Sequence, residues 1–183
     1  MTEFTLHTAE TAPDGASPLF EKSIKAFGMV PNLHAVMAES PELLDAYQSA
    51  HTLFQASSLS DVERNIVWMA INVQNQCHYC VPAHSAIAKM QGVDDATIEQ
   101  LRNGEQLSDQ RLETLRSFTL EIVRQHGRLD EAQVQAFLDA GFTKRNILDV
   151  ILGVAQKTMS NYVNHFADTP VDAMFASYAW EPA

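Results

Sequence analysis

Recurrent helix-start signals are the feature that most constrains the fold of this 183-residue chain. At several places a serine, threonine or aspartate comes directly before an amphipathic stretch, and such a side chain can cap the first amide groups of a helix. No run of alternating β-branched residues competes with this pattern. The sequence therefore predicts an all-α fold. The predicted helix starts are Ser17-Pro18, Ser40-Pro41, the capping box Ser60-Asp61-Val62-Glu63, Ser108, Asp130 and Thr143.

Glycines mark the expected ends of these helices. Gly28, Gly92, Gly127 and Gly141 each follow an apolar periodic stretch, as C-terminal capping glycines do. Between the helix that starts at Ser60 and the next one, the chain is expected to break or kink near residues 75–76.

One compact domain spanning residues 17–177 is the expected organisation, because a chain of this length can bury a core without disulfides or metals. Residues 1–16 are expected to form a flexible arm, since they are poor in apolar side chains and contain Pro13 and Gly15. Residues 178–183 are expected to form a C-terminal tail.

The net charge limits the partners. Twelve Lys and Arg residues against 23 Asp and Glu residues give a formal charge of −11, which disfavours nucleic acid and anionic membranes as partners. No segment approaches the roughly 20 apolar residues that span a bilayer. The first residues lack the basic and apolar regions of a secretory signal. We therefore expect a cytoplasmic protein with reduced thiols.

Cys77-His78-Tyr79-Cys80, followed by His84, contains the only two cysteines of the chain. If a helix begins near Gln76, both sulfurs lie close to its N-terminus, where free amide groups and the helix dipole favour a thiolate. His84 lies one turn beyond Cys80 but seven residues beyond Cys77, or about 10 Å of helix rise. We therefore assign Cys80 as the attacking thiolate, His84 as its base and proton carrier, and Cys77 as the resolving sulfur.

Two simpler interpretations of this motif stay open. Cys77, Cys80, His84 and His165 could together bind zinc, or the cysteines could be buried thiols beside a core histidine. His78 and Tyr79 are most simply a surface residue and a packing residue. The sequence has no dinucleotide turn, phosphate loop or paired-histidine metal helix, so we expect no cofactor and no metal, and electrons must come from a separate thiol reductant.

Two stretches of the chain resemble the AhpD-like alkylhydroperoxidases of the carboxymuconolactone decarboxylase superfamily, closest to its peroxidase-related branch. The resemblance spans about residues 17–177. It implies an all-helical fold with the CxxC motif at the N-terminal end of a central helix, assembled into a homo-oligomer, a trimer or a hexamer. The residues that carry it are Leu59-Ser60, Glu63-Arg64, Asn75-Gln76-Cys77-His78-Tyr79-Cys80-Val81-Pro82-Ala83-His84 and Lys157-Thr158-Met159-Ser160-Asn161-Tyr162-Val163-Asn164-His165.

The resemblance also implies a function. It points to a peroxidase that reduces organic or hydrogen peroxides through a Cys77–Cys80 disulfide cycle, with Cys80 as the peroxidatic residue and His84 in its proton relay. A dihydrolipoyl or thioredoxin-type dithiol would be the electron donor. Two other functions stay open, a redox sensor that changes assembly without turnover and a cofactor-free lactone decarboxylase.

The chain departs from the family pattern in two places. Asn65 stands twelve residues before the first cysteine, where family members carry a relay glutamate, and Tyr79 stands where they carry a histidine. An amide side chain cannot deliver a proton at neutral pH, so the relay is incomplete and we expect modest peroxidase activity. His165, or water held by Asn65, is the hypothetical replacement.

Overall fold

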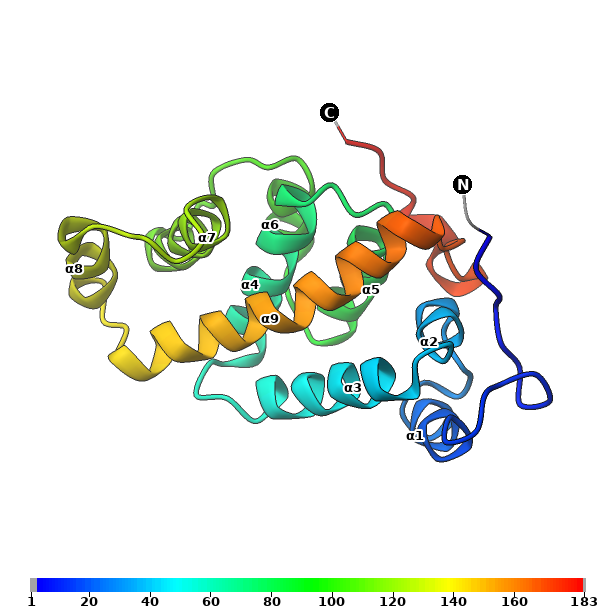
Figure 1. The fold of residues 1–183 in the computed structure, drawn as a ribbon. Coiled ribbons are helices and arrows are strands. Elements are labelled where there is room, and N and C mark those ends of the chain that lie inside the picture. The colour runs from blue at the N-terminus through cyan, green and yellow to red at the C-terminus, as the bar shows by residue number, and fades with distance from the viewer. Residues whose placement is uncertain (1–2, 183) are drawn as a thin grey trace.

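A computed structural model describes residues 3–182, and all regular secondary structure in that range is helical, which confirms the predicted all-α fold (Figure 1). Residues 1–2 of the expected arm and residue 183 of the expected tail lie outside the described residues. The helices are α1 Ser17–Phe27, α2 Asn32–Met37, α3 Pro41–Gln55, α4 Asp61–Gln74, α5 Cys80–Met90, α6 Asp95–Arg102, α7 Gln110–Arg124, α8 Glu131–Asp139, α9 Lys144–Ala167 and the 3-10 helix η1 Ala173–Tyr178.

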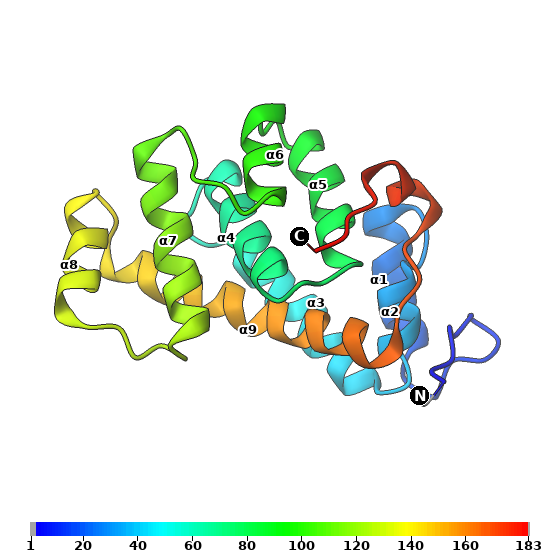
Figure 2. The ribbon, with the colours of Figure 1, turned by 90° about the horizontal axis from the view of Figure 1, so that it is seen from above.

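Helix α9 is the longest helix and runs through the whole molecule. Figures 1 and 2 show α7 and α8 near its start and α2 and η1 near its end. It packs against α2, α3, α4, α5 and α7. Thr143 caps its first turn in a reciprocal pair with Asn146, as predicted for this helix start. Because α9 contacts most of the other helices, a side chain on its inner face can reach residues far away in sequence.

Most of the predicted helix caps and helix ends are found at the predicted residues. Ser40 and Ser60 accept hydrogen bonds from backbone amides in the first turns of α3 and α4, and Gly28 ends α1 in the left-handed conformation with φ of 75°. The break near residues 75–76 is confirmed as well, since Gln76 has a φ of 53°.

Two of the predicted caps are wrong by one residue. Helix α1 already includes Ser17, because Ala16 before it adopts a helical conformation, and the Ser17 hydroxyl makes no cap bond. In α7 the cap is Asp109 instead of Ser108, because its carboxylate accepts the amide of Leu112 at 2.9 Å.

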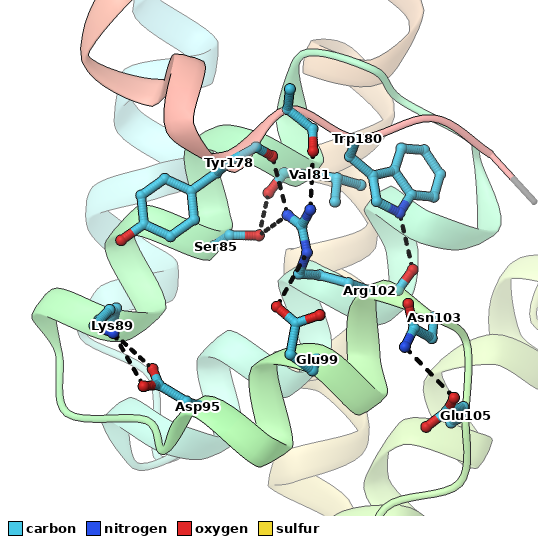
Figure 3. Close-up of polar contacts among 11 residues, drawn as sticks. Val81, Ser85, Lys89, Asp95, Glu99, Arg102, Asn103, Glu105, Tyr178 and Trp180 are labelled. Atoms are coloured by element: carbon cyan, nitrogen blue, oxygen red, sulfur yellow. Dashed lines mark hydrogen bonds and ion pairs between the residues drawn. The ribbon is translucent and has the colours of Figure 1, made fainter.

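The C-terminal segment is held in place, in contrast to the expected tail. Arg102 donates from its guanidinium to the Tyr178 and Ala179 carbonyl oxygens at 3.0 Å each and to the Ser85 hydroxyl at 2.9 Å (Figure 3). Trp180 donates in turn to the carbonyl of Arg102 at 2.9 Å. These bonds join the segment after η1 to α5 and α6. Sequence analysis did not predict α6.

Residues 3–16 of the N-terminal arm contain no helix, but they are attached to the rest of the molecule. The amide of His7 donates to the carbonyl of Ala35 at 3.3 Å, and its ring bonds Glu39 at 2.7 Å. The arm therefore lies against α2 and the residues that follow it.

Candidate active site

The cysteine motif occupies the turn between α4 and α5. Helix α5 begins at Cys80 and not near Gln76, because the left-handed Gln76 interrupts the helix and the amide of Cys77 turns back to the carbonyl of Asn72 at 3.0 Å. The backbone amide of Cys80 donates to the Cys77 sulfur at 3.3 Å. Both cysteines are free and buried. Cys80 thus lies at the helix N-terminus, as predicted, and Cys77 lies one turn before it.

A polar stripe on α9 covers the two sulfurs. The side-chain amide of Asn161 donates to the Cys80 sulfur at 3.1 Å, and that of Asn164 donates to the same sulfur at 3.2 Å. The Ser160 hydroxyl lies 3.8 Å from it. These α9 residues are fully buried, so their hydrogen bonds act in a water-poor environment where they are strong.

Lys157 belongs to the same stripe and is buried, with 1% of its surface exposed. Its ammonium nitrogen lies 3.0 Å from Nε2 of His84. None of the carboxylates in residues 3–182 forms an ion pair with it. Burial alone would lower the pKa of Lys157, but the facing Cys80 thiolate outweighs this effect and raises that pKa. The charge partner of the buried lysine is therefore Cys80.

The two thiols have opposite pKa shifts. Burial by itself would raise the pKa of Cys80, but the hydrogen bond from the Cys77 thiol, the charge of Lys157 and the polar groups of Ser160 and Asn161 together lower it to about 5. The pKa of Cys77 is raised because its thiol donates to the Cys80 sulfur and is itself buried. At neutral pH the pair therefore holds one proton, on Cys77, and Cys80 is the thiolate.

His84 lies one turn after Cys80, as the spacing predicted, but its hydrogen-bond partner is Lys157 and not Cys80. It lies on the same face of α5 as Cys80, but its Nε2 meets Lys157, and Nδ1 is buried with no hydrogen-bond partner in the described part of the chain. Burial, with the nearby Lys157 charge, lowers the pKa of His84 well below its ordinary value. Its ring is therefore neutral, and the cation that stabilises the thiolate is Lys157 rather than a histidinium.

The two further predicted residues lie elsewhere. His165 is exposed in the last turn of α9, so the structure does not bring it to the thiols, and the four candidate zinc ligands do not converge. Residues 3–182 also contain no group of three or more His, Cys, Asp or Glu side chains arranged for a metal ion. Asn65 is buried, and its amide donates to the Asp61 carbonyl at 2.8 Å and to the Gln91 side chain at 2.7 Å.

The two residues between the cysteines fix the turn. Tyr79 is buried; its hydroxyl donates to the carboxylate of Asp172 and accepts the amide of Leu33 at 3.3 Å. His78 is partly exposed and bonds the Thr169 carbonyl at 3.0 Å. Tyr79 is thus a packing residue, as expected, and also joins the motif to α2 and to the residue before η1.

His84 is one of the residues that line a cavity of about 580 Å³. Its lining is mainly apolar and aromatic, and it contains three imidazoles. Burial is the main cause that lowers the pKa values of His34 and His51 to about 4, so these rings are neutral at pH 7. Two other aromatic side chains of the lining are His51, which stacks on Trp68, and Trp68 itself, whose ring centre lies 5.0 Å from that of His84. The cavity can therefore hold an uncharged, largely apolar molecule.

The α9 residues are the part of the site that sequence reasoning missed. Lys157, Ser160, Asn161 and Asn164 follow Val150 on one helix face at spacings of three and four, so they continue an apolar stripe with polar side chains. The lysine in this stripe is the sequence signal that could have revealed the site. A lysine on a buried helix face needs a charge partner, because lysines are almost never buried unpaired.

Comparison with known proteins supports one family. Residues 39–106 match the model of the carboxymuconolactone decarboxylase family. None of the curated proteins matches. A search of solved structures found an alkylhydroperoxidase AhpD core, an uncharacterized peroxidase-related protein from Ralstonia eutropha JMP134, with a TM-score of 0.84 and 22% identity over 94% of this chain and 93% of that chain.

Two further solved structures show the range of this fold. An uncharacterized peroxidase-related protein from Silicibacter sp. TM1040 has a TM-score of 0.80 and 26% identity over 95% of this chain and 93% of that chain. The debrominase Bmp8, in complex with 2,3,4-tribromopyrrole, has a TM-score of 0.79 and 16% identity over 97% of this chain and 95% of that chain.

Proposed function

We propose that this chain, which matches the carboxymuconolactone decarboxylase family over residues 39–106 and is similar in fold to AhpD-core proteins, is a thiol-dependent peroxidase with Cys80 as its nucleophile. The observation that carries the proposal is the environment of that sulfur. Two amide donors and a buried lysine surround Cys80, so its thiolate is stable at neutral pH. A thiolate, and not a thiol, is the species that attacks a peroxide.

Cys77 completes the cycle. In the first step the Cys80 thiolate attacks one peroxide oxygen, the O–O bond breaks, and Cys80 becomes a sulfenic acid while an alcohol or water leaves. In the second step the Cys77 thiol attacks the Cys80 sulfur, an S–S bond forms, and the sulfenic oxygen leaves as water with the Cys77 proton. Besides the hydrogen bond to Cys80 and burial, the negative charge of Cys80 contributes to the raised pKa of Cys77. Loss of that charge in the sulfenic acid therefore makes Cys77 easier to deprotonate, and its proton passes to the departing oxygen.

The proposed cycle requires a reductant that restores the two thiols. Return to the dithiol needs two electrons, and we propose an external dithiol of the dihydrolipoyl or thioredoxin type as their source. Assembly into a homo-oligomer and a cytoplasmic location stay expectations. No helix in residues 3–182 is both long and apolar enough to cross a membrane.

The direct test is steady-state reduction of cumene hydroperoxide with a dithiol donor. We expect turnover by the wild type and none by Cys80→Ser; Cys77→Ser should react once and then stop as the sulfenic acid. A disulfide that forms without turnover would instead indicate a redox sensor. Turnover of a lactone that survives in Cys80→Ser would indicate a decarboxylase, and turnover of a brominated pyrrole in place of peroxide would indicate a dehalogenase.

A further inference from the structure

The hydrogen bond between Lys157 and His84 determines where the imidazole proton lies. An ammonium group has only donors, so Lys157 donates to Nε2 of His84 across 3.0 Å. A neutral imidazole that accepts at Nε2 carries its proton on Nδ1. This Nδ1–H is buried and, within residues 3–182, has no acceptor. Burial of a donor without a partner is unfavourable, so a ligand atom that accepts from it would be favoured.

The position of His84 suggests which ligand atom that is. His84 is one of the residues that line the cavity, and Cys80, which does not line it, precedes His84 by one turn on the same face of α5. Side chains at this spacing have Cβ atoms about 5–6 Å apart. A hydroperoxide that reaches the Cys80 sulfur would therefore have its second oxygen in the neighbourhood of His84, where the buried Nδ1–H can donate to it.

We propose that Lys157 and His84 form a proton relay, in which Lys157 holds His84 as the Nδ1–H tautomer and His84 passes this proton to the oxygen that leaves the peroxide. The inference rests on the proposed peroxidase function and deepens it. His84 is then a catalytic residue, and Lys157 is a positioning residue that also supplies the replacement proton.

Charges and atoms balance in this step. Before it, the site holds the Lys157 ammonium and the Cys80 thiolate, with no net charge. As the S–O bond forms and the O–O bond breaks, Nδ1 of His84 protonates the departing alkoxide, and Nε2 takes a proton from Lys157. Afterwards Cys80 is a neutral sulfenic acid, Lys157 is a neutral amine, and His84 is the other neutral tautomer. The neutral ring thus carries a proton without becoming a buried cation.

His84 already belongs to the relay that the family resemblance implied, and the new element here is Lys157 as its partner and proton source. The relay position on α4 is Asn65, whose amide hydrogens are both bonded elsewhere, and His165 is exposed. The proton source proposed here lies on α9 instead. The titratable groups that face Lys157 from the helices packed around it are Tyr47 and His51 on α3, His84 and Cys80 on α5, and Cys77 in the turn before α5.

Two reactions of the same thiolate test the relay. Iodoacetamide releases iodide, which needs no proton, whereas a peroxide releases an alkoxide, which does. The rates of both reactions with reduced protein would be measured in single-turnover experiments with iodoacetamide and cumene hydroperoxide, and their ratio reports proton delivery alone. Lys157→Arg keeps the positive charge but cannot give up a proton, and His84→Gln removes the carrier. Lys144→Arg, at an exposed position of the same helix, is the matched control.

We expect the peroxide rate, divided by the alkylation rate of the same variant, to fall about 100-fold in both site variants, as for loss of a general acid. Division by the alkylation rate removes any change that the substitution makes in the thiolate itself. Wild-type ratios in both variants, with an active wild type, would overturn the relay alone. A wild type that alkylates but does not react with peroxide would overturn the proposed function and the relay with it.

Discussion

Asn161 points its amide nitrogen, and not its oxygen, at Cys80. The nitrogen donates to the Cys80 sulfur at 3.1 Å and to the Asn72 oxygen at 3.0 Å, while the Asn161 oxygen accepts the Asn75 amide at 2.9 Å. Both faces of the amide are used, so its orientation is fixed. The sulfur consequently meets a preorganised donor, which stabilises the negative charge without any rearrangement.

Replacing this donor with an acceptor should make Cys80 less reactive. Asn161→Asp has nearly the same shape but places a carboxylate oxygen beside the sulfur, and a like charge at this distance raises a thiol pKa by about 1–3 units. We therefore expect the iodoacetamide rate near pH 6 to fall about tenfold or more. Asn103→Asp, on the exposed end of α6, is the control. Equal rates for the two variants would contradict the assigned role.

The pH dependence of the wild type follows from the lowered pKa of Cys80. Because this pKa is about 5, the thiolate dominates at every higher pH and is lost as the pH falls through that value. Alkylation should therefore be almost constant from about pH 6 to 8 and decrease below this range. In Lys157→Met the cation is absent, so the decrease should begin at higher pH. A wild-type midpoint near 8.5, the ordinary value for cysteine, would refute the thiolate assignment.

Stability should depend on pH through the buried His34. Burial, with the nearby His51, lowers the folded-state pKa of His34 to about 4, below the unfolded value of about 6.5. The folded state then binds fewer protons, so its advantage is complete above pH 6.5 and shrinks as the pH falls toward 4. Between about pH 7.5 and 5.5 this amounts to about 1 kcal/mol.

Urea unfolding at these two pH values measures the effect. His34→Gln should lose about 1 kcal/mol less than the wild type does on acidification. His165→Gln, at an exposed site, should behave as the wild type does. Identical losses in all three proteins would show that His34 is not the group that titrates.

At Gly153, helix α9 packs closely against both α3 and α4. A methyl group there would meet two ring carbons of Phe54 at 2.9 Å and a methyl of Val67 at 3.0 Å, and both neighbours are fully buried. Gly153→Ala should thus destabilise the protein by about 1–3 kcal/mol through overpacking, although alanine favours a helix. The reverse exchange Ala155→Gly, on the exposed side of α9, isolates the helix propensity and should cost about 1 kcal/mol. A stabilised Gly153→Ala in urea unfolding would contradict the close packing.

Most features that depend on interactions between residues close in sequence were predicted correctly, whereas features that depend on contacts between distant residues were mostly missed. Ser40, Ser60 and Thr143 cap helices through amides only three residues away, so the sequence displays these caps completely. The pairing of Cys77 with Cys80 is equally local. The short helix α6 was missed, although Asp94 caps it in the same way.

The polar half of the site depends on packing between distant helices. Asn164 contacts Cys80 across 84 positions, and nothing near either residue in sequence indicates that contact. His165 shows how sensitive such predictions are, because one residue is about 100° of helix rotation. This rotation places the side chain of Asn164 against the Cys80 sulfur and the side chain of His165 in solvent. The position of Lys157 in the stripe is visible in the sequence, but its contact with His84 and its proximity to Cys80 become visible only once α9 is docked.

Because α9 supplies the polar groups around Cys80, this cysteine becomes reactive only once α9 has docked. During synthesis the cysteine turn leaves the ribosome long before α9, and domains fold as their parts emerge. Until α9 docks, both thiols have an ordinary pKa of about 8.5 and are mostly protonated. A nascent or unfolded molecule thus carries two slow thiols, poorly suited to stray oxidation or mixed disulfides, and the fast thiolate arises only with the finished fold.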